Sequence, residues 1–237
     1  MGRRYAIAGM VAACALVAVI VGGSLASASA VSAAETRQSD GLRHAHLLVI
    51  GDSWAAGLYA DPNATLVQVA AAALGWHVDV DAVAGTGYLN DAGTVDGDYP
   101  DRIAALPADT AADVVLIQGG SNDLQDSISA LPAAVRRTIV LARRRFPDAR
   151  LVLLGPGPDP EPVTGPQLEV DGILATAAKR MNVPYVSILQ QRWVTAENVD
   201  SVIDPSNHHP TVVGDAYLGG RLAAALKALL ETSPTSR

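Results

Sequence analysis

The chain has 237 residues, of which 49% are hydrophobic and 17% are charged. This composition can supply the core of one large domain or two small ones, and it excludes a disordered, collagen-like or coiled-coil protein. A net charge of -7 argues against nucleic-acid binding. The single cysteine excludes a disulfide framework and any zinc site built on paired cysteines.

Residues 1–34 have the pattern of a secretory signal peptide. Arg3 and Arg4 provide a positive start, an apolar run covers 5–21, and small residues with A-x-A-like cleavage sites fill 26–34. We expect cleavage, with a permanent membrane anchor as the alternative, because about 17 apolar residues is at the short limit of a membrane span. The sequence therefore predicts a secreted or cell-envelope protein.

A short polar linker is predicted at 35–43, followed by one domain at 44–237. In this domain short apolar runs alternate with longer amphipathic ones. Strands are predicted at 46–50, 78–83, 112–118, 149–154 and 184–189. Helices are predicted at 64–74, 128–146, 167–181 and 211–230. The alternation predicts a doubly wound, three-layer α/β fold with a five-stranded parallel sheet.

The first predicted strand runs into Gly51-Asp52-Ser53. A serine on a tight turn between a strand and a helix has its hydroxyl raised above the edge of the sheet. There it lies beside N–H groups at the positive end of the helix. This environment suits a nucleophile whose attack creates an oxyanion. Turns use glycine, aspartate and serine widely, so the motif alone is weak.

Three further turns carry groups compatible with such a nucleophile. The third predicted strand leads to Asn122, whose amide can donate a hydrogen bond to developing negative charge. The second leads to Gly85 and Gly87, whose N–H groups no side chain shields. His209 lies just before Pro210 and the last predicted helix, where the helix dipole keeps an imidazole neutral and available as a base. In a doubly wound sheet these turns meet at one edge.

Together these motifs resemble the SGNH (GDSL) hydrolase family, from the first predicted strand to the last predicted helix. The matching blocks are Gly51-Asp52-Ser53, Gly87 with Gly85 as the alternative, Gly120-Ser121-Asn122-Asp123, and His209-Pro210. Trp54 stands where leucine is usual in the family. The resemblance implies the flavodoxin-like fold of SGNH hydrolases and an exported, bacterial-type esterase or lipase.

The resemblance also implies a role for each matching residue. Ser53 would be the nucleophile and His209 the general base and acid. The oxyanion hole would consist of the Ser53 N–H, the Gly87 N–H and the Asn122 side chain. No metal and no organic cofactor is implied.

The sequence departs from the family pattern before the histidine. The family has an aspartate three residues before it, where this chain has Ser206. Asp204 lies five residues before His209, and we favour it as the third member of a triad. Otherwise a backbone carbonyl orients the imidazole and a Ser–His dyad operates. His208 is an alternative base, although the Pro-Thr sequence that follows favours His209.

The predicted function is that of an exported serine esterase that cleaves a lipid, acylated-sugar or small-molecule ester through an acyl-serine intermediate. One alternative is an acyltransferase that uses the same serine on cell-envelope glycans or lipids. Another is a non-catalytic, flavodoxin-like ligand-binding domain. We expect a monomer without a nucleic-acid partner, and membrane or cell-envelope association stays open.

Three loops at the edge of the sheet are expected to decide the substrate: 88–101, 155–166 and 190–203. The first carries Tyr88 and Tyr99, which either stack on a sugar or pack in the core. The arginines of the predicted helix 128–146 are expected to form a solvated face, since they lie opposite its apolar stripe.

Overall fold

The computed structural model describes residues 44–95, 97–158, 163 and 165–232. The predicted signal peptide and the linker at 35–43 lie outside the described residues, so their boundaries stay predictions. In the part of the chain that is described, no helix is both long enough and apolar enough to cross a membrane.

All strands of the sheet run parallel. They are β1 (His46–Gly51), β2 (His77–Ala82), β3 (Val114–Gln118), β4 (Arg150–Leu154) and β5 (Tyr185–Val186). Their order in the sheet is β2-β1-β3-β4-β5. β1 therefore lies inside the sheet, where Leu47 is in register with Val78 of β2 and with Val114 of β3. The predicted five-stranded, doubly wound parallel sheet is confirmed.

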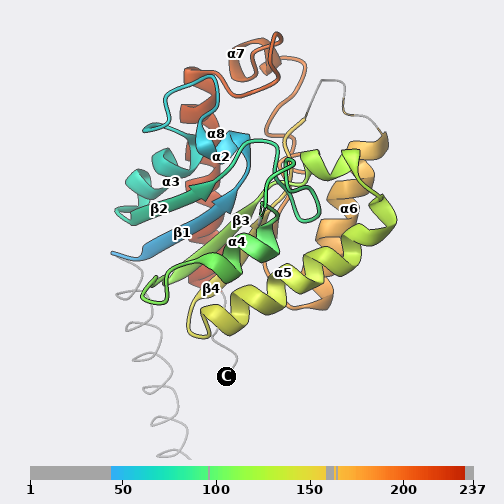
Figure 1. Cartoon of the computed structure of the whole chain (residues 1–237). Helices are drawn as coiled ribbons and strands as arrows, with labels where there is room; N and C mark the ends of the chain where they lie inside the picture. Colours follow the sequence, from blue (N-terminus) through green and yellow to red (C-terminus); the bar gives the residue numbers. More distant parts are fainter. Residues whose placement is uncertain (1–43, 96, 159–162, 164, 233–237) are drawn as a thin grey trace, which may run out of the picture. The chain divides into compact units, whose positions relative to one another are not determined.

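Helices cover both faces of the sheet. Figure 1 shows the first layer, α3 (Leu66–Leu74) and α8 (Val212–Thr232), packed side by side on one face. The second layer covers the other face and contains α4 (Tyr99–Ala105), α5 (Leu131–Arg145) and α6 (Gly165–Arg180). Because both faces are covered, β3 is buried at every residue and is almost wholly apolar.

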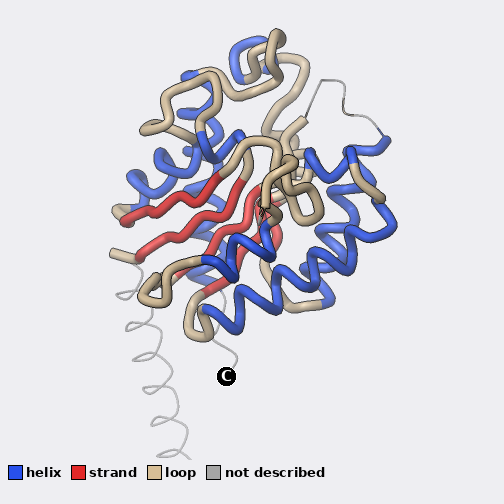
Figure 2. Tube along the Cα trace, in the orientation of Figure 1, coloured by secondary structure: helices blue, strands red, loops and turns tan. Residues whose placement is uncertain are grey.

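Short elements fill the turns that follow the strands. These are α2 (Ser53–Ala56), the 3₁₀ helices η1 (Ser121–Gln125) and η2 (Ile128–Ala130), and α7 (Val199–Val202). In Figure 2 the loops drawn in tan gather beyond one end of the red strands. This end is the carboxyl edge of the sheet, where parallel α/β folds bind their ligands.

The structure differs from the sequence prediction mainly in short elements. Helix α4 begins inside the expected loop 88–101 and continues to Ala105, where no helix was predicted, and β5 has two residues instead of six. Tyr88 and Tyr99 are fully buried, with their ring centroids 5.0 Å apart. They therefore pack in the core and cannot stack on a sugar.

The arginines of α5 lie on its exposed side, as expected. Three of them hold neighbouring segments. Arg137 forms an ion pair with Asp101 at 2.7 Å, Arg143 donates to the carbonyl oxygen of Met181 at 2.7 Å, and Arg145 donates to that of Pro107. The basic face of this helix thus has a structural use.

A buried carboxyl joins α3 to α8. Asp215 is 2% exposed, and its Oδ1 accepts a hydrogen bond from the Leu66 N–H at 2.9 Å. That N–H belongs to the first turn of α3 and has no partner within the helix. Burial raises the pKa of Asp215 to about 7, although the hydrogen bond opposes the rise.

The raised pKa makes the stability of the fold depend on pH. In the folded protein Asp215 has a pKa of about 7 and binds its proton more tightly than in the unfolded chain. Its contribution to the free energy of unfolding therefore falls as the pH rises from about 4 to about 7. Asp215→Asn keeps an acceptor but has no charge to bury. The quantity to compare is the unfolding temperature of the variant minus that of the wild type. We expect this difference to be larger at pH 8 than at pH 5 by on the order of 5 °C.

Circular dichroism melts at the two pH values measure this effect. The other buried carboxyls are common to both proteins and cancel in the comparison. Asp200→Asn removes an exposed carboxyl of α7 and serves as the control. We expect its unfolding temperature to differ from that of the wild type by the same amount at both pH values. A difference for Asp215→Asn that does not change with pH would contradict the assignment.

Candidate active site

Ser53 stands at the turn that leads from β1 into α2. Asp52 is the N-cap of this short helix, and its side chain accepts a hydrogen bond from the Trp54 N–H at 2.9 Å. Gly57 ends the helix with φ of 71°, a left-handed conformation that favours glycine. Ser53 is therefore the first helical residue, and the sheet and both caps fix its place.

His209 lies in a closed turn just before α8. An antiparallel bridge between Ile203 and Pro210 closes the turn, and the Asp204 N–H donates to the carbonyl oxygen of His209 at 2.8 Å. The Thr211 hydroxyl accepts from the Gly214 N–H and so caps the helix that follows. These bonds hold the imidazole at the same edge as Ser53.

The two side chains meet, although 156 residues separate them. His209 Nε2 lies 2.8 Å from Ser53 Oγ. The other ring nitrogen, Nδ1, lies 2.6 Å from the backbone carbonyl oxygen of Asn207. A carbonyl oxygen only accepts, so Nδ1 must carry the proton, and the Nε2 lone pair then faces the serine hydroxyl. This is the tautomer that a general base needs.

Asp204 does not lie where the favoured triad would have it. Its Oδ1 accepts two hydrogen bonds from Ser206, one from the N–H at 2.8 Å and one from the hydroxyl at 2.6 Å. The bonds from Ser206 lower the pKa of Asp204, whose carboxyl is open to solvent. The Nδ1 proton of His209 is already donated to Asn207, so the geometry is that of the alternative, a backbone-oriented Ser–His pair.

His208 takes no part in this pair, since the ring that meets Ser53 is that of His209. His208 has a left-handed backbone with φ of 60°, and its N–H donates to the Asp204 carbonyl oxygen at 2.8 Å. Asp204, Ser206 and His208 together shape the turn. Two extra residues in this turn, compared with the family pattern, explain why the aspartate is displaced from the ring.

Asn122 lies in η1, in the turn that follows β3. Its Nδ2 donates to the carbonyl oxygen of Thr86 at 2.9 Å, which ties the turn after β3 to the turn after β2. An amide nitrogen has two protons, so one of them is left for a ligand. The prediction that Asn122 comes to the same edge as Ser53 agrees with this placement.

The two glycines of the turn after β2 differ in their surroundings. The Gly87 N–H donates to the Asn90 carbonyl oxygen at 2.8 Å, and a Cβ at Gly87 would lie 2.5 Å from Asp123 Oδ1. Gly87, which we favoured as an oxyanion donor, thus has its N–H already paired and is needed for close packing. Gly85 has φ of 82°, and no acceptor for its N–H is found among the described residues. Among the described residues, the alternative, Gly85, is thus the glycine whose N–H is left for a ligand.

Two buried carboxylates support these turns. Asp123 is fully buried and accepts from the N–H groups of Tyr88, Leu89 and Asn90 at 3.2, 2.7 and 3.2 Å. Burial raises the pKa of Asp123 to about 6 and that of Asp52 to about 6, and the hydrogen bonds from backbone N–H groups oppose both rises.

Arg102 of α4 is the buried cation of this region, and sequence reasoning missed it. Its guanidinium donates to the Gly51 carbonyl oxygen at 3.0 Å, to the Thr86 hydroxyl at 2.9 Å and to Asp81 Oδ1 at 2.7 Å. It thus joins the ends of β1 and β2 to the turn that carries Gly85. Its one sequence signal was an arginine placed between Asp101 and the apolar run 103–106.

Comparison with known proteins identifies the family. Residues 49–217 match the family model described as the GDSL-like lipase/acylhydrolase family, a span of more than half the chain. The chain belongs to this family. A curated relative, GDSL lipase Rv0518 of Mycobacterium tuberculosis, is 29% identical over 174 residues, which are 72% of this chain and 71% of the relative.

Solved structures share the fold at low identity. A family two carbohydrate esterase from Clostridium thermocellum in complex with cellohexaose has a TM-score of 0.64 at 18% identity, over 80% of this chain and 65% of its own. The salicylyl-acyltransferase SsfX3 of a tetracycline biosynthetic pathway has a TM-score of 0.61 at 21% identity, over 78% and 55%. A protein of the G-D-S-L family from Desulfitobacterium hafniense DCB-2 has a TM-score of 0.63 at 16% identity, over 76% and 99%.

Trp54, where members of the GDSL family usually have leucine, closes one side of the serine turn. It is 8% exposed, and Gly157 packs against its ring so closely that a Cβ at that position would overlap it. The beginning of the proline-rich loop 155–166 is therefore held beside Ser53. Residues 159–162 and 164 of this loop lie outside the described residues, so its role in substrate choice stays a prediction.

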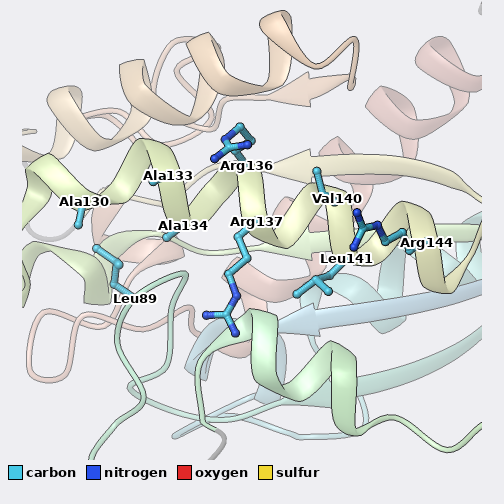
Figure 3. A pocket seen from close by; sticks show the side chains of 9 residues that line it. All are labelled: Leu89, Ala130, Ala133, Ala134, Arg136, Arg137, Val140, Leu141 and Arg144. Carbon is cyan, nitrogen blue, oxygen red and sulfur yellow. The ribbon is translucent and has the colours of Figure 1, made fainter.

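A hollow on α5 is a separate feature of this GDSL-family domain. Leu89, Ala130 of η2 and both apolar residues and arginines of α5 line it (Figure 3). Figure 3 shows Arg136 and Arg137 pointing to opposite sides of the helix, and Arg137 is paired with Asp101. None of the predicted site residues lines the hollow, and its guanidinium groups do not converge on one point.

Proposed function

We propose that the protein is an exported serine esterase that cleaves carboxylic esters through an acyl-Ser53 intermediate. The observation that carries the proposal is the 2.8 Å contact of Ser53 Oγ with His209 Nε2, together with the Nδ1 proton held by Asn207. A serine hydroxyl is a weak nucleophile until a neighbouring base accepts its proton. Membership of the GDSL-like family makes an ester the expected substrate.

In the proposed reaction, Ser53 Oγ attacks the ester carbonyl carbon while its proton passes to His209 Nε2. The carbonyl oxygen becomes an oxyanion, which receives hydrogen bonds from the Asn122 amide and from the N–H groups of Ser53 and Gly85. When the tetrahedral intermediate collapses, the carbon–oxygen bond to the alcohol breaks and His209 protonates the departing oxygen. Water then attacks the acyl-serine with His209 as base, which releases the acid and restores Ser53.

Acyl transfer is the second candidate, since the acyl-serine can react with a sugar or lipid hydroxyl in place of water. The acyltransferase SsfX3 shares the fold, so the fold is compatible with either outcome. The ratio of transfer to hydrolysis, measured with glycerol as the added acceptor, distinguishes the two.

The test of the enzyme proposal is the turnover of p-nitrophenyl acetate together with labelling by a fluorophosphonate. We expect the wild type to cleave the ester and to be labelled at Ser53. Ser53→Ala should lower kcat by roughly three to six orders of magnitude with a nearly unchanged unfolding temperature, because only the nucleophile is lost. A folded wild type that is neither labelled nor active would point instead to a non-catalytic ligand-binding domain.

Asn122→Ala tests the oxyanion donor. Loss of one preorganised donor should lower kcat by roughly 10²–10³ and change KM little, because the donor acts on charge that develops in the transition state. Asn90→Ala removes an amide from the neighbouring turn, where Asn90 Nδ2 donates to the Asn122 carbonyl oxygen at 3.2 Å, and serves as the matched control. Equal losses in the two variants would mean that Asn122 only supports the turns.

Asp204→Asn separates a Ser–His dyad from a triad. Asparagine can still accept from Ser206, so we expect kcat/KM within about threefold of the wild type. A carboxylate that orients the catalytic imidazole would cost roughly 10⁴ in kcat when it is replaced in this way. Ser206→Ala controls for damage to the turn. A large loss in Asp204→Asn that Ser206→Ala does not share would restore Asp204 as a triad member.

A further inference from the structure

Tyr59 is an exposed aromatic residue in direct contact with the imidazole of His209. It lies in the connection between α2 and α3, and its ring meets the His209 ring edge-on, with centroids 5.2 Å apart. The residue is 70% exposed. A tyrosine that only fills the core would be buried, as Tyr88 and Tyr99 are.

The backbone of Tyr59 is in a costly conformation. Its φ is 67°, in the left-handed region that residues other than glycine, asparagine and aspartate rarely adopt. The preceding residues form a turn in which the Ala60 N–H donates to the Gly57 carbonyl oxygen at 3.1 Å. This turn holds the bulky ring in solvent at the expense of backbone strain. Such strain persists where the surrounding structure requires it, and it gathers at functional sites.

The position of Tyr59 assigns it to one part of an ester. In the proposed reaction, His209 Nε2 must reach both Ser53 Oγ and the oxygen of the departing alcohol, so the alcohol lies on the histidine side of the serine. The oxyanion lies on the other side, toward Asn122, which is tied to Thr86. A ring that touches His209 and is open to solvent therefore faces the alcohol and not the acyl chain.

The helix that follows His209 exposes apolar side chains near its start. Val212 and Val213 follow His209 by three and four residues in the first turn of α8, and they are 65% and 64% exposed. An exposed aromatic ring beside the catalytic histidine favours a partner that has an apolar face. A phenyl ring, or the C–H face of a sugar ring, can pack on the tyrosine in this way.

The geometry points to Tyr59 as the residue that binds the alcohol part of the ester, with a preference for alcohols that present a flat ring. The inference rests on the proposed esterase function and names the substrate feature that the same site selects. Tyr59 is thus a specificity-determining residue of the alcohol subsite, apart from the Ser53–His209 chemistry.

The test compares two acetates that differ in the alcohol alone. Benzyl and methyl acetate share the acyl group, and their alcohols have similar acidity, so the chemical step is matched. The quantity measured is kcat/KM, because it covers the steps up to the departure of the alcohol. We expect Tyr59→Ala to lower kcat/KM for benzyl acetate roughly five- to tenfold, as expected for the loss of an aromatic packing contact. The change for methyl acetate should stay below about twofold.

Three further variants make the result specific. Tyr59→Phe keeps the ring and should retain the preference for benzyl acetate, whereas Tyr59→Gly should lose it while relieving the backbone strain. Tyr217→Ala removes a half-exposed tyrosine of α8 and should leave both acetates unchanged. The ratio of methyl butyrate to methyl acetate should be the same in all variants, because it reports on the acyl side.

The outcomes separate this inference from the proposed function. If the wild type cleaves neither acetate and is not labelled by fluorophosphonate, the esterase function itself fails. If the wild type is labelled and active but Tyr59→Ala lowers both acetates equally, Tyr59 only positions His209, and the alcohol subsite is refuted. An altered butyrate-to-acetate ratio in Tyr59→Ala would place the ring on the acyl side and overturn the assignment as well.

Discussion

Every turn that carries a candidate functional group leaves the same edge of the sheet because all the strands run in one direction. A parallel sheet forces each connection to cross back over a face, so the chain returns to the carboxyl edge after every strand. The order β2-β1-β3-β4-β5 places β1 between β2 and β3. The serine turn is therefore flanked by the glycine turn on one side and by the asparagine turn on the other.

This convergence brings buried charge with it. Asp52, Asp123 and Arg102 lie under the turns, where each would be costly without hydrogen-bond partners. Asp123 is held by backbone N–H groups of the turn after β2, and Arg102 by the Gly51 carbonyl oxygen and the side chains of Thr86 and Asp81. The polar network therefore fixes the turns at this edge of the sheet. The raised pKa values of Asp52 and Asp123 reflect the free-energy cost of burying their charged forms. Rigidity at the edge is obtained at the expense of stability, as active sites commonly require.

The sequence was sufficient for the fold and for the pairing of Ser53 with His209, because strand–helix alternation and short motifs are local signals. It was insufficient where placement depends on side-chain direction. Asp204 has the right residue type near His209, yet its carboxylate turns back to Ser206. The sequence alone does not distinguish Gly87 from Gly85 as the oxyanion donor. The structure does, because the Gly87 N–H is bonded to the carbonyl oxygen of Asn90. No sequence motif pointed to Tyr59, because its contact with His209 joins two loops that are distant in sequence.

The contact between Trp54 and Gly157 links two positions that are far apart in sequence. The large indole occupies the space that any side chain at residue 157 would need. In a relative with leucine beside the nucleophile, that space is open and residue 157 is released from the requirement for glycine. The two positions should therefore vary together in evolution, and an exchange of loop 155–166 between relatives should succeed only when the residue after the serine is exchanged with it.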